Sequence, residues 1–254
     1  MFKIAANLSH LWPEIPYLDR FDAAAEAGFE GVEVLFPYDM PAKDTQRALL
    51  KSGLPMVLIN APPPNYTGGA RGFAAVPELD DRFRFDLRRA LRYCEALRVP
   101  MLHVMTGAAE GTEARETLIA NLRWASEQVP ENMTLLLEPL NTVSMPGYYL
   151  NDYELAADIL NELGISNIAL QFDTFHAQTI HGDALEVYEK HKLLVRHIQI
   201  GDAPDRTTPG QGDVNFNAFF DRLKADGYAG WVSAEYTPGP QTEDSLSWLH
   251  ALRP

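Results

Sequence analysis

The chain has 254 residues, a formal net charge of −14 and a single cysteine. The length suits either one α/β barrel, for which about 250 residues is typical, or two small domains. An acidic surface repels the phosphate backbone that nucleic-acid-binding proteins hold, so the charge favours a small-molecule partner. One cysteine excludes an intrachain disulfide, and no uninterrupted apolar stretch is long enough to cross a bilayer. A start without the charged lead and long apolar core of a secretory signal predicts a cytoplasmic protein.

Short apolar runs, mostly continuous rather than alternating, occur eight times along the chain. Strands that are covered on both faces, as in parallel sheets, have such continuous apolar cores. The predicted strands are residues 3–7, 31–36, 55–60, 101–105, 134–138, 168–173, 196–200 and 231–235.

Amphipathic helical segments separate these strands. Gly28, Gly164 and Gly227 directly follow three of the segments or lie one residue beyond them, as glycines that end helices commonly do. The predicted helices are residues 19–27, 44–51, 81–97, 112–128, 152–163, 183–190, 217–225 and 242–252.

Strict alternation of eight strands and helices favours a closed (β/α)8 TIM barrel of class α/β, a single domain over residues 1–254. An open, doubly wound sheet is the alternative. The sequence contains neither a G-x-G-x-x-G turn nor a G-x-x-x-x-G-K-[ST] loop, so no nucleotide cofactor is predicted. A proline- and glycine-rich loop at residues 62–72 follows the third strand, and its length favours a lid or a substrate-facing loop.

Polar residues stand at or near the carboxyl end of every predicted strand. In a barrel these ends meet around one mouth, where the active sites of TIM-barrel enzymes lie. In chain order the residues are Asn7, Glu33 (inside its strand), Asn60, His103, Glu138, Asp173, Gln199 and Glu235.

The strongest candidate site is formed by Glu138, Asp173, Gln199 and Glu235, which belong to the last four strands. Carboxylates at the tips of apolar strands are partly desolvated, and three together are costly unless a cation or shared protons compensate their charge. Oxygen-rich clusters of this kind suit Mg²⁺ or Mn²⁺. Taken singly, each residue also suits a helix N-cap or a solvated loop. Taken together, the four predict a shared site.

Further polar residues near the strand ends are candidates for contact with substrate. His176 suits a hydrogen-bond donor or proton relay, or alternatively a surface histidine. Arg206 suits a fork that binds a substrate carboxylate or hydroxyl pair, or alternatively a partner of Asp202 or Asp205. The remaining candidates for substrate binding are Asn7, His103 and Arg71. For His103, His197 and Glu33 the alternative is a residue satisfied within the barrel interior.

Several short motifs, in order and in register with the eight strands, resemble the hydroxypyruvate isomerase family. This family lies within the xylose-isomerase-like barrel superfamily, which also holds ketose 3-epimerases and endonuclease IV. The resemblance covers nearly the whole chain. The motifs are AANLS at 5–9, AGF at 27–29, VE at 32–33, LFPY at 35–38, HVM at 103–105, LEPLN at 137–141, DTFHAQ at 173–178, HIQ at 197–199, PDR at 204–206, GYAGW at 227–231, EYTP at 235–238 and TE at 242–243.

The resemblance implies a role for each candidate. Glu138 and Glu235 would be the catalytic acid/base pair of an isomerase that shifts a carbonyl group along a short 2-oxo or hydroxy acid through an enediolate. Glu138, Asp173, Gln199 and Glu235 would bind a divalent cation, Mg²⁺ or Mn²⁺, and His176 and Arg206 would contact the substrate.

Two positions differ from the pattern of the families that the chain resembles. Related epimerases have a metal-binding histidine where Gln199 stands, and relatives in the isomerase branch often have a lysine where Thr237 stands. Three alternatives to a carbonyl-shifting isomerase are a metal-dependent ketose 3-epimerase, a phosphodiesterase acting on DNA, and a sugar-binding barrel without catalysis. A homo-oligomer is compatible with all of them.

Overall fold

The computed structural model describes residues 2–62 and 71–252, and in it eight parallel strands close into a barrel in sequence order. The fold predicted from the alternation of strands and helices is therefore confirmed. The strands are β1 (Lys3–Asn7), β2 (Gly31–Glu33), β3 (Met56–Ala61), β4 (Met101–Val104), β5 (Thr134–Leu137), β6 (Ile168–Asp173), β7 (Val195–Ile200) and β8 (Trp231–Ala234).

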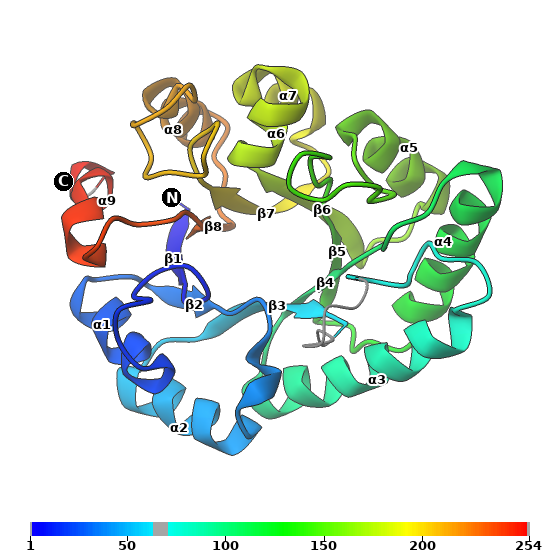
Figure 1. Ribbon diagram of the computed structural model, residues 1–254, viewed down its shortest axis with the longest axis horizontal. Coiled ribbons are helices and arrows are strands. Elements are labelled where there is room, and N and C mark those ends of the chain that lie inside the picture. Colours follow the sequence, from blue (N-terminus) through cyan, green and yellow to red (C-terminus); the bar gives the residue numbers. More distant parts are fainter. Residues whose placement is uncertain (1, 63–70, 253–254) are drawn as a thin grey trace.

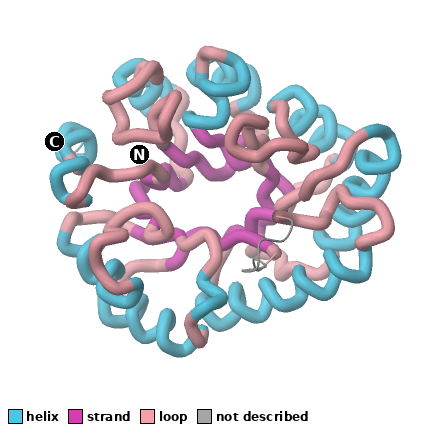
Figure 2. Tube along the Cα trace, viewed as in Figure 1, coloured by secondary structure: helices cyan, strands magenta, loops and turns pink. Residues whose placement is uncertain are grey.

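Helices form an outer ring around the strands (Figures 1 and 2). They are α1 (Arg20–Glu26), α2 (Ala42–Ser52), α3 (Asp80–Leu97), α4 (Gly111–Ser126), α5 (Tyr153–Leu163), α6 (Thr174–His181), α7 (Ala184–His191), α8 (Phe216–Ala225) and α9 (Ser247–Leu252). Short 3₁₀ helices lie at η1 (Tyr17–Asp19), η2 (Pro37–Asp39) and η3 (Thr242–Ser245). Within the two described ranges, no helix is both long enough and apolar enough to span a membrane.

Apolar side chains close the amino end of the barrel. Val57, Met101 and Leu136 belong to a buried cluster against which Trp231 packs. Gly31 leaves room for this indole, since a Cβ at that position would lie 2.9 Å from the Trp231 ring. The candidate site lies at the other end of the barrel.

Beyond shifts of one or two residues at element ends, the structure differs from the predicted elements at three places. The strand predicted at residues 31–36 ends at Glu33. Residues 174–181 form α6, which the sequence did not predict, and the helix begins because the Asp173 carboxylate accepts the Phe175 N–H at 2.8 Å as an N-cap. The predicted helix 242–252 is divided into η3 and α9 at Leu246. Most of the predicted substrate-facing loop, residues 63–70, lies outside the described residues.

Candidate active site

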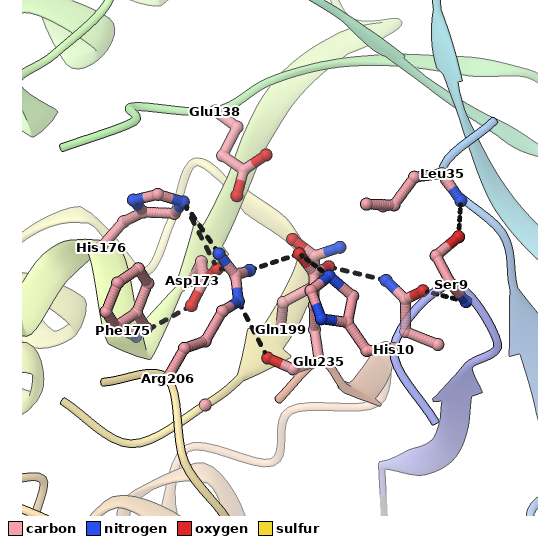
Figure 3. Close-up of polar contacts among 12 residues, drawn as sticks. Ser9, His10, Leu35, Glu138, Asp173, Phe175, His176, Gln199, Arg206 and Glu235 are labelled. Atoms are coloured by element: carbon pink, nitrogen blue, oxygen red, sulfur yellow. Dashed lines mark hydrogen bonds and ion pairs between the residues drawn. The ribbon is translucent and has the colours of Figure 1, made fainter. Parts of the chain in front are cut away.

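The four residues predicted to form the site meet at the carboxyl-end mouth of the barrel (Figure 3). Glu138 and Glu235 directly follow β5 and β8, and Asp173 and Gln199 lie at the ends of β6 and β7. All four side chains are buried, with at most 5% of any residue exposed. Apolar strands thus bring polar groups that are far apart in sequence into one desolvated cluster.

Arg206, in the loop after β7, lies between two of these carboxylates (Figure 3). Its Nη2 donates to Asp173 Oδ2 and Glu235 Oε1, and its Nε donates to the Glu235 carbonyl oxygen at 3.1 Å. The guanidinium also lies 5.0 Å from the centre of the Phe175 ring. Pairing with Asp202 or Asp205, one of the alternatives drawn from the sequence, is therefore wrong. Arg206 instead supplies positive charge between two buried acids.

The loop that carries Arg206 is held by Asp202. Its carboxylate accepts the backbone N–H groups of Ala203 and Val214 at 3.0 Å and of Gly210 and Gly212 at 2.8 Å. Gly212 allows this close approach, because a Cβ there would lie 2.0 Å from the Ala203 carbonyl oxygen. The buried Asp202 thus fixes the path of the chain on both sides of Arg206.

Replacing Asp202 by Ala will lower the free energy of unfolding by about 3 kcal/mol. Four backbone N–H groups, two of them in buried hydrogen bonds, lose their carboxylate acceptor, and hydrogen bonds to water replace the lost ones only in part. The control is Asp205→Ala, an exposed residue of the same loop, for which we expect a change below about 0.5 kcal/mol. Urea unfolding measures both. Equal losses would show that the backbone contacts of Asp202 do not hold the loop.

Burial raises the pKa of all three carboxyl groups at the mouth. The pKa of Glu138 lies well above its ordinary value, because burial is reinforced by the negative charges of Glu235 and Asp173. Burial raises the pKa of Glu235 to about 8, although Arg206 opposes the shift. Burial also raises the pKa of Asp173, again against the charge of Arg206. Without a cation, protons are therefore retained in this cluster near neutral pH.

His176 has a defined hydrogen-bonding role. It is 3% exposed, so the surface-histidine alternative is wrong. Its Nδ1 accepts the backbone N–H of Asn141 at 3.0 Å, and burial together with Arg206 lowers its pKa well below the ordinary value. The ring is therefore neutral, and because Nδ1 accepts, its proton lies on Nε2. This atom is 3.3 Å from Arg206 Nη1 and 3.8 Å from Asp173 Oδ2. His176 thus presents a donor to the mouth of the barrel.

His103 on β4 and Asn7 on β1 each contact one of the two glutamates. The Nδ1 atom of His103 lies 3.3 Å from Glu138 Oε2, and burial lowers the pKa of His103 to about 3. Asn7 Nδ2 donates to Glu235 Oε2 at 2.8 Å and to Glu33 Oε1 at 2.7 Å. Asn7 therefore orients a predicted catalytic carboxylate, and its own contact with substrate stays a prediction.

A hydrogen-bonded chain of polar residues lies beneath the mouth. Gln171 Nε2 donates to Glu138 Oε2 at 2.8 Å and to Gln199 Oε1 at 2.6 Å, and Gln199 Nε2 donates to Glu33 Oε1 at 2.7 Å. His197 Nε2 lies 2.8 Å from Glu33 Oε2, which confirms the interior reading of these two residues. Gln171 was missed, and its signal was its position two residues before Asp173, on the same face of β6.

Several of these groups offer ligands for a divalent cation. Single ligand atoms of Glu138, Asp173 and His176 lie within 4.8 Å of one another. The Nε2 proton of His176 argues against this histidine as a ligand, whereas carboxylate oxygens suit Mg²⁺ or Mn²⁺. Gln199 offers an amide oxygen that now accepts from Gln171. The carboxylates fit a hard cation, and the full ligand set predicted from the sequence stays a prediction.

A pocket of about 170 Å³ opens above the carboxylates. It is smaller than the roughly 300–1,000 Å³ of pockets for drug-sized ligands, so it suits a short molecule. Six of the predicted residues line it, namely Arg71, His103, Glu138, His176, Arg206 and Glu235. His10, which was not predicted as a site residue, lines it too, with Nε2 3.6 Å from Glu235 Oε1.

A closed (β/α)8 barrel with a buried acidic cluster at its carboxyl-end mouth has the layout of a TIM-barrel enzyme. Residues 21–252 match the xylose isomerase-like TIM barrel family, and the chain belongs to that family.

Relatives are similar over their full length. The chain is 38% identical to a 2-oxo-tetronate isomerase of Cupriavidus necator, with 98% of each chain covered. It is 33% identical to the hydroxypyruvate isomerase of Escherichia coli, with 100% of each covered. A solved protein from Brucella melitensis, called AP endonuclease, family 2, is 41% identical over 100% of both chains, with a TM-score of 0.95.

Proposed function

We propose that this protein is an isomerase that moves a carbonyl group between adjacent carbons of a short 2-oxo acid. The observation that carries the proposal is the pair of buried carboxyl groups, Glu138 and Glu235, that line one small pocket. The full-length similarity to relatives called 2-oxo-tetronate isomerase and hydroxypyruvate isomerase supports it. The same proposal includes a single domain over residues 1–254 and a cytoplasmic location.

The reaction requires one carboxylate to act as a base and another carboxyl group to act as an acid. Glu235 accepts hydrogen bonds from Arg206 and Asn7, which favour its ionised form, whereas Glu138 accepts from Gln171. We therefore assign Glu235 as the base that removes the proton from the hydroxyl-bearing carbon and leaves an enediolate. Glu138 delivers a proton to the former carbonyl carbon, and a proton passes between the two oxygens, so the composition is unchanged.

His176 has a ring nitrogen within 4.8 Å of Glu138, and the guanidinium of Arg206 contacts Glu235. Both groups would stabilise negative charge on the enediolate oxygens. A bound Mg²⁺ or Mn²⁺ would add positive charge at the same place. We propose that Glu138, Asp173 and Glu235 hold this cation and that Gln199 joins them through its amide oxygen, turned away from Gln171.

A panel of substrates tests the proposal. We expect turnover of hydroxypyruvate or 2-oxotetronates, little turnover of ketoses with four to six carbons, loss of activity with a chelator, and recovery with Mn²⁺ or Mg²⁺. Product analysis by NMR distinguishes a shifted carbonyl from an inverted carbon. Epimerised ketose as the main product would contradict the isomerase and favour the 3-epimerase alternative. No turnover of any substrate would favour a sugar-binding barrel without catalysis.

The name of the Brucella relative makes a nuclease the second candidate function. A net charge of −14 opposes binding to a phosphate backbone, and a pocket of about 170 Å³ suits a short molecule better than a duplex. Incubation with DNA that contains abasic sites, in low salt with Mn²⁺ or Zn²⁺, should leave the strands intact. Cleavage that is lost in Glu138→Gln would establish the nuclease instead.

A further inference from the structure

The pocket is lined by two guanidinium groups that lie on different sides of the barrel. Arg206 follows β7, whereas Arg71 lies between β3 and β4. Because the strands close in sequence order, the β3–β4 side lies across the mouth from β7 and β8. The two arginines therefore approach a bound molecule from different directions.

The charges of the two arginines are used differently. Arg206 is committed to Asp173 and Glu235, and its Nε is held by the Glu235 carbonyl oxygen. Within residues 2–62 and 71–252, Arg71 has no hydrogen-bond or ion-pair partner. Among the described residues, no side chain competes with a negatively charged substrate group for the guanidinium of Arg71.

The backbone beside Arg71 is fixed although its side chain is exposed. Gly72 forms an antiparallel bridge with Thr106, just after β4, and the Ala75 N–H donates to the Thr106 carbonyl oxygen at 2.8 Å. Gly72 has φ +102°, and a Cβ there would lie 2.4 Å from the Met105 carbonyl oxygen, so glycine is needed for this contact. These contacts hold the backbone next to Arg71 in place, and its guanidinium lines the pocket from there.

Two buried polar side chains on the same side of the pocket carry atoms that make no hydrogen bond within the part of the chain that the structure describes. These atoms are Asn60 Oδ1 and His103 Nε2, whereas His103 Nδ1 faces Glu138 Oε2 at 3.3 Å; Asn60 is 5% exposed and His103 is 1% exposed. Both residues line the pocket together with Arg71. Buried polar groups without partners are costly, so their position indicates that a polar ligand satisfies them.

We propose that Arg71 is the specificity-determining residue that binds the carboxylate of a short 2-oxo acid, with Asn60 and His103 beside it. This inference rests on the proposed function. It orients the substrate, with the carboxylate toward β3 and β4 and the reacting carbons toward Glu138 and Glu235. A planar guanidinium that can form two parallel hydrogen bonds suits a carboxylate better than an ammonium does.

Steady-state kinetics of Arg71→Gln and Arg71→Lys test the assignment. We expect Arg71→Gln to raise KM for the 2-oxo acid by about 10- to 100-fold, because a charge-assisted hydrogen bond to the substrate is lost, and to change kcat by less than about threefold. Arg71→Lys should recover part of the affinity. The matched control is Arg47→Gln on α2, an exposed arginine paired with Asp44, which should leave both constants unchanged.

A pair of inert probes separates carboxylate recognition from a general effect on the pocket. Pyruvate carries the carboxylate and hydroxyacetone lacks it, so Arg71→Gln should weaken inhibition by pyruvate about 10- to 100-fold and leave inhibition by hydroxyacetone unchanged. Unchanged KM and unchanged pyruvate inhibition would overturn the assignment. If the wild type turns over no 2-oxo acid, the proposed function fails, and calorimetric binding of pyruvate to wild type and Arg71→Gln still decides the role of Arg71.

Discussion

Replacing Glu138 or Glu235 by Gln will lower kcat on the 2-oxo acid by about 10³-fold, because a positioned acid or base contributes about 10²–10⁴-fold to such a proton transfer. The amide preserves the size of the side chain and can still accept from Gln171 at position 138 or from Asn7 at position 235. What is lost is the ability to gain or release a proton. KM should change by less than about tenfold if the amide keeps its place.

The two variants should differ in which step fails. With Glu235→Gln the base is absent, so exchange of the substrate C–H proton with solvent deuterium should stop. With Glu138→Gln the base is present, so proton exchange should continue while net isomerisation is slowed. Glu131→Gln, an exposed substitution just before β5, serves as the control and should leave kcat unchanged. A Glu138→Gln enzyme that stays folded and keeps near-full turnover would contradict the assignment of Glu138 and Glu235 as the acid/base pair.

The strands could be predicted because their signal is local. Continuous apolar runs such as Leu135–Leu137 require cover on both faces, and eight of them in alternation with helices leave few topologies. The barrel then places the strand ends together, which is why Glu138, Asp173, Gln199 and Glu235 were found together from sequence alone. Helix α6 was missed because its first turn coincides with the motif after β6, which was interpreted as site residues only.

The pairing inside the site depends on contacts that sequence spacing does not encode. Arg206 stands four residues after Asp202, yet the Asp202 carboxylate is occupied by backbone N–H groups and the guanidinium reaches Asp173 and Glu235 instead. The alternation of β6 could have revealed Gln171, but its partners Glu138 and Gln199 lie on neighbouring strands. Register and side-chain direction, rather than residue type, decide such contacts.

Arg206→Met will lower the free energy of unfolding by about 3–5 kcal/mol at pH 8, because it leaves buried carboxyl groups without their counter-charge. The effect depends on pH. Burial already raises the pKa of Glu235 from about 4.5 to about 8, and Arg206 opposes that rise, so its removal raises the pKa of Glu235 and Asp173 further. A carboxyl group whose pKa is raised by folding lowers the free energy of unfolding increasingly as the pH rises above the pKa of that group in the unfolded chain.

The cost of Arg206→Met should therefore be small at low pH, where both acids stay protonated in the folded wild type and in the folded variant. It should grow as the pH rises through the pKa values of the folded wild type, which for Glu235 is about 8. Urea unfolding at pH 5, 6.5 and 8 in the presence of a chelator measures it, with Arg222→Met on the surface of α8 as the control. Mn²⁺ or Mg²⁺ should stabilise Arg206→Met more than the wild type, since a cation held by these carboxylates replaces the missing charge. An equal loss at all three pH values would show that Arg206 stabilises the loop by packing on Phe175 rather than by compensating the acids.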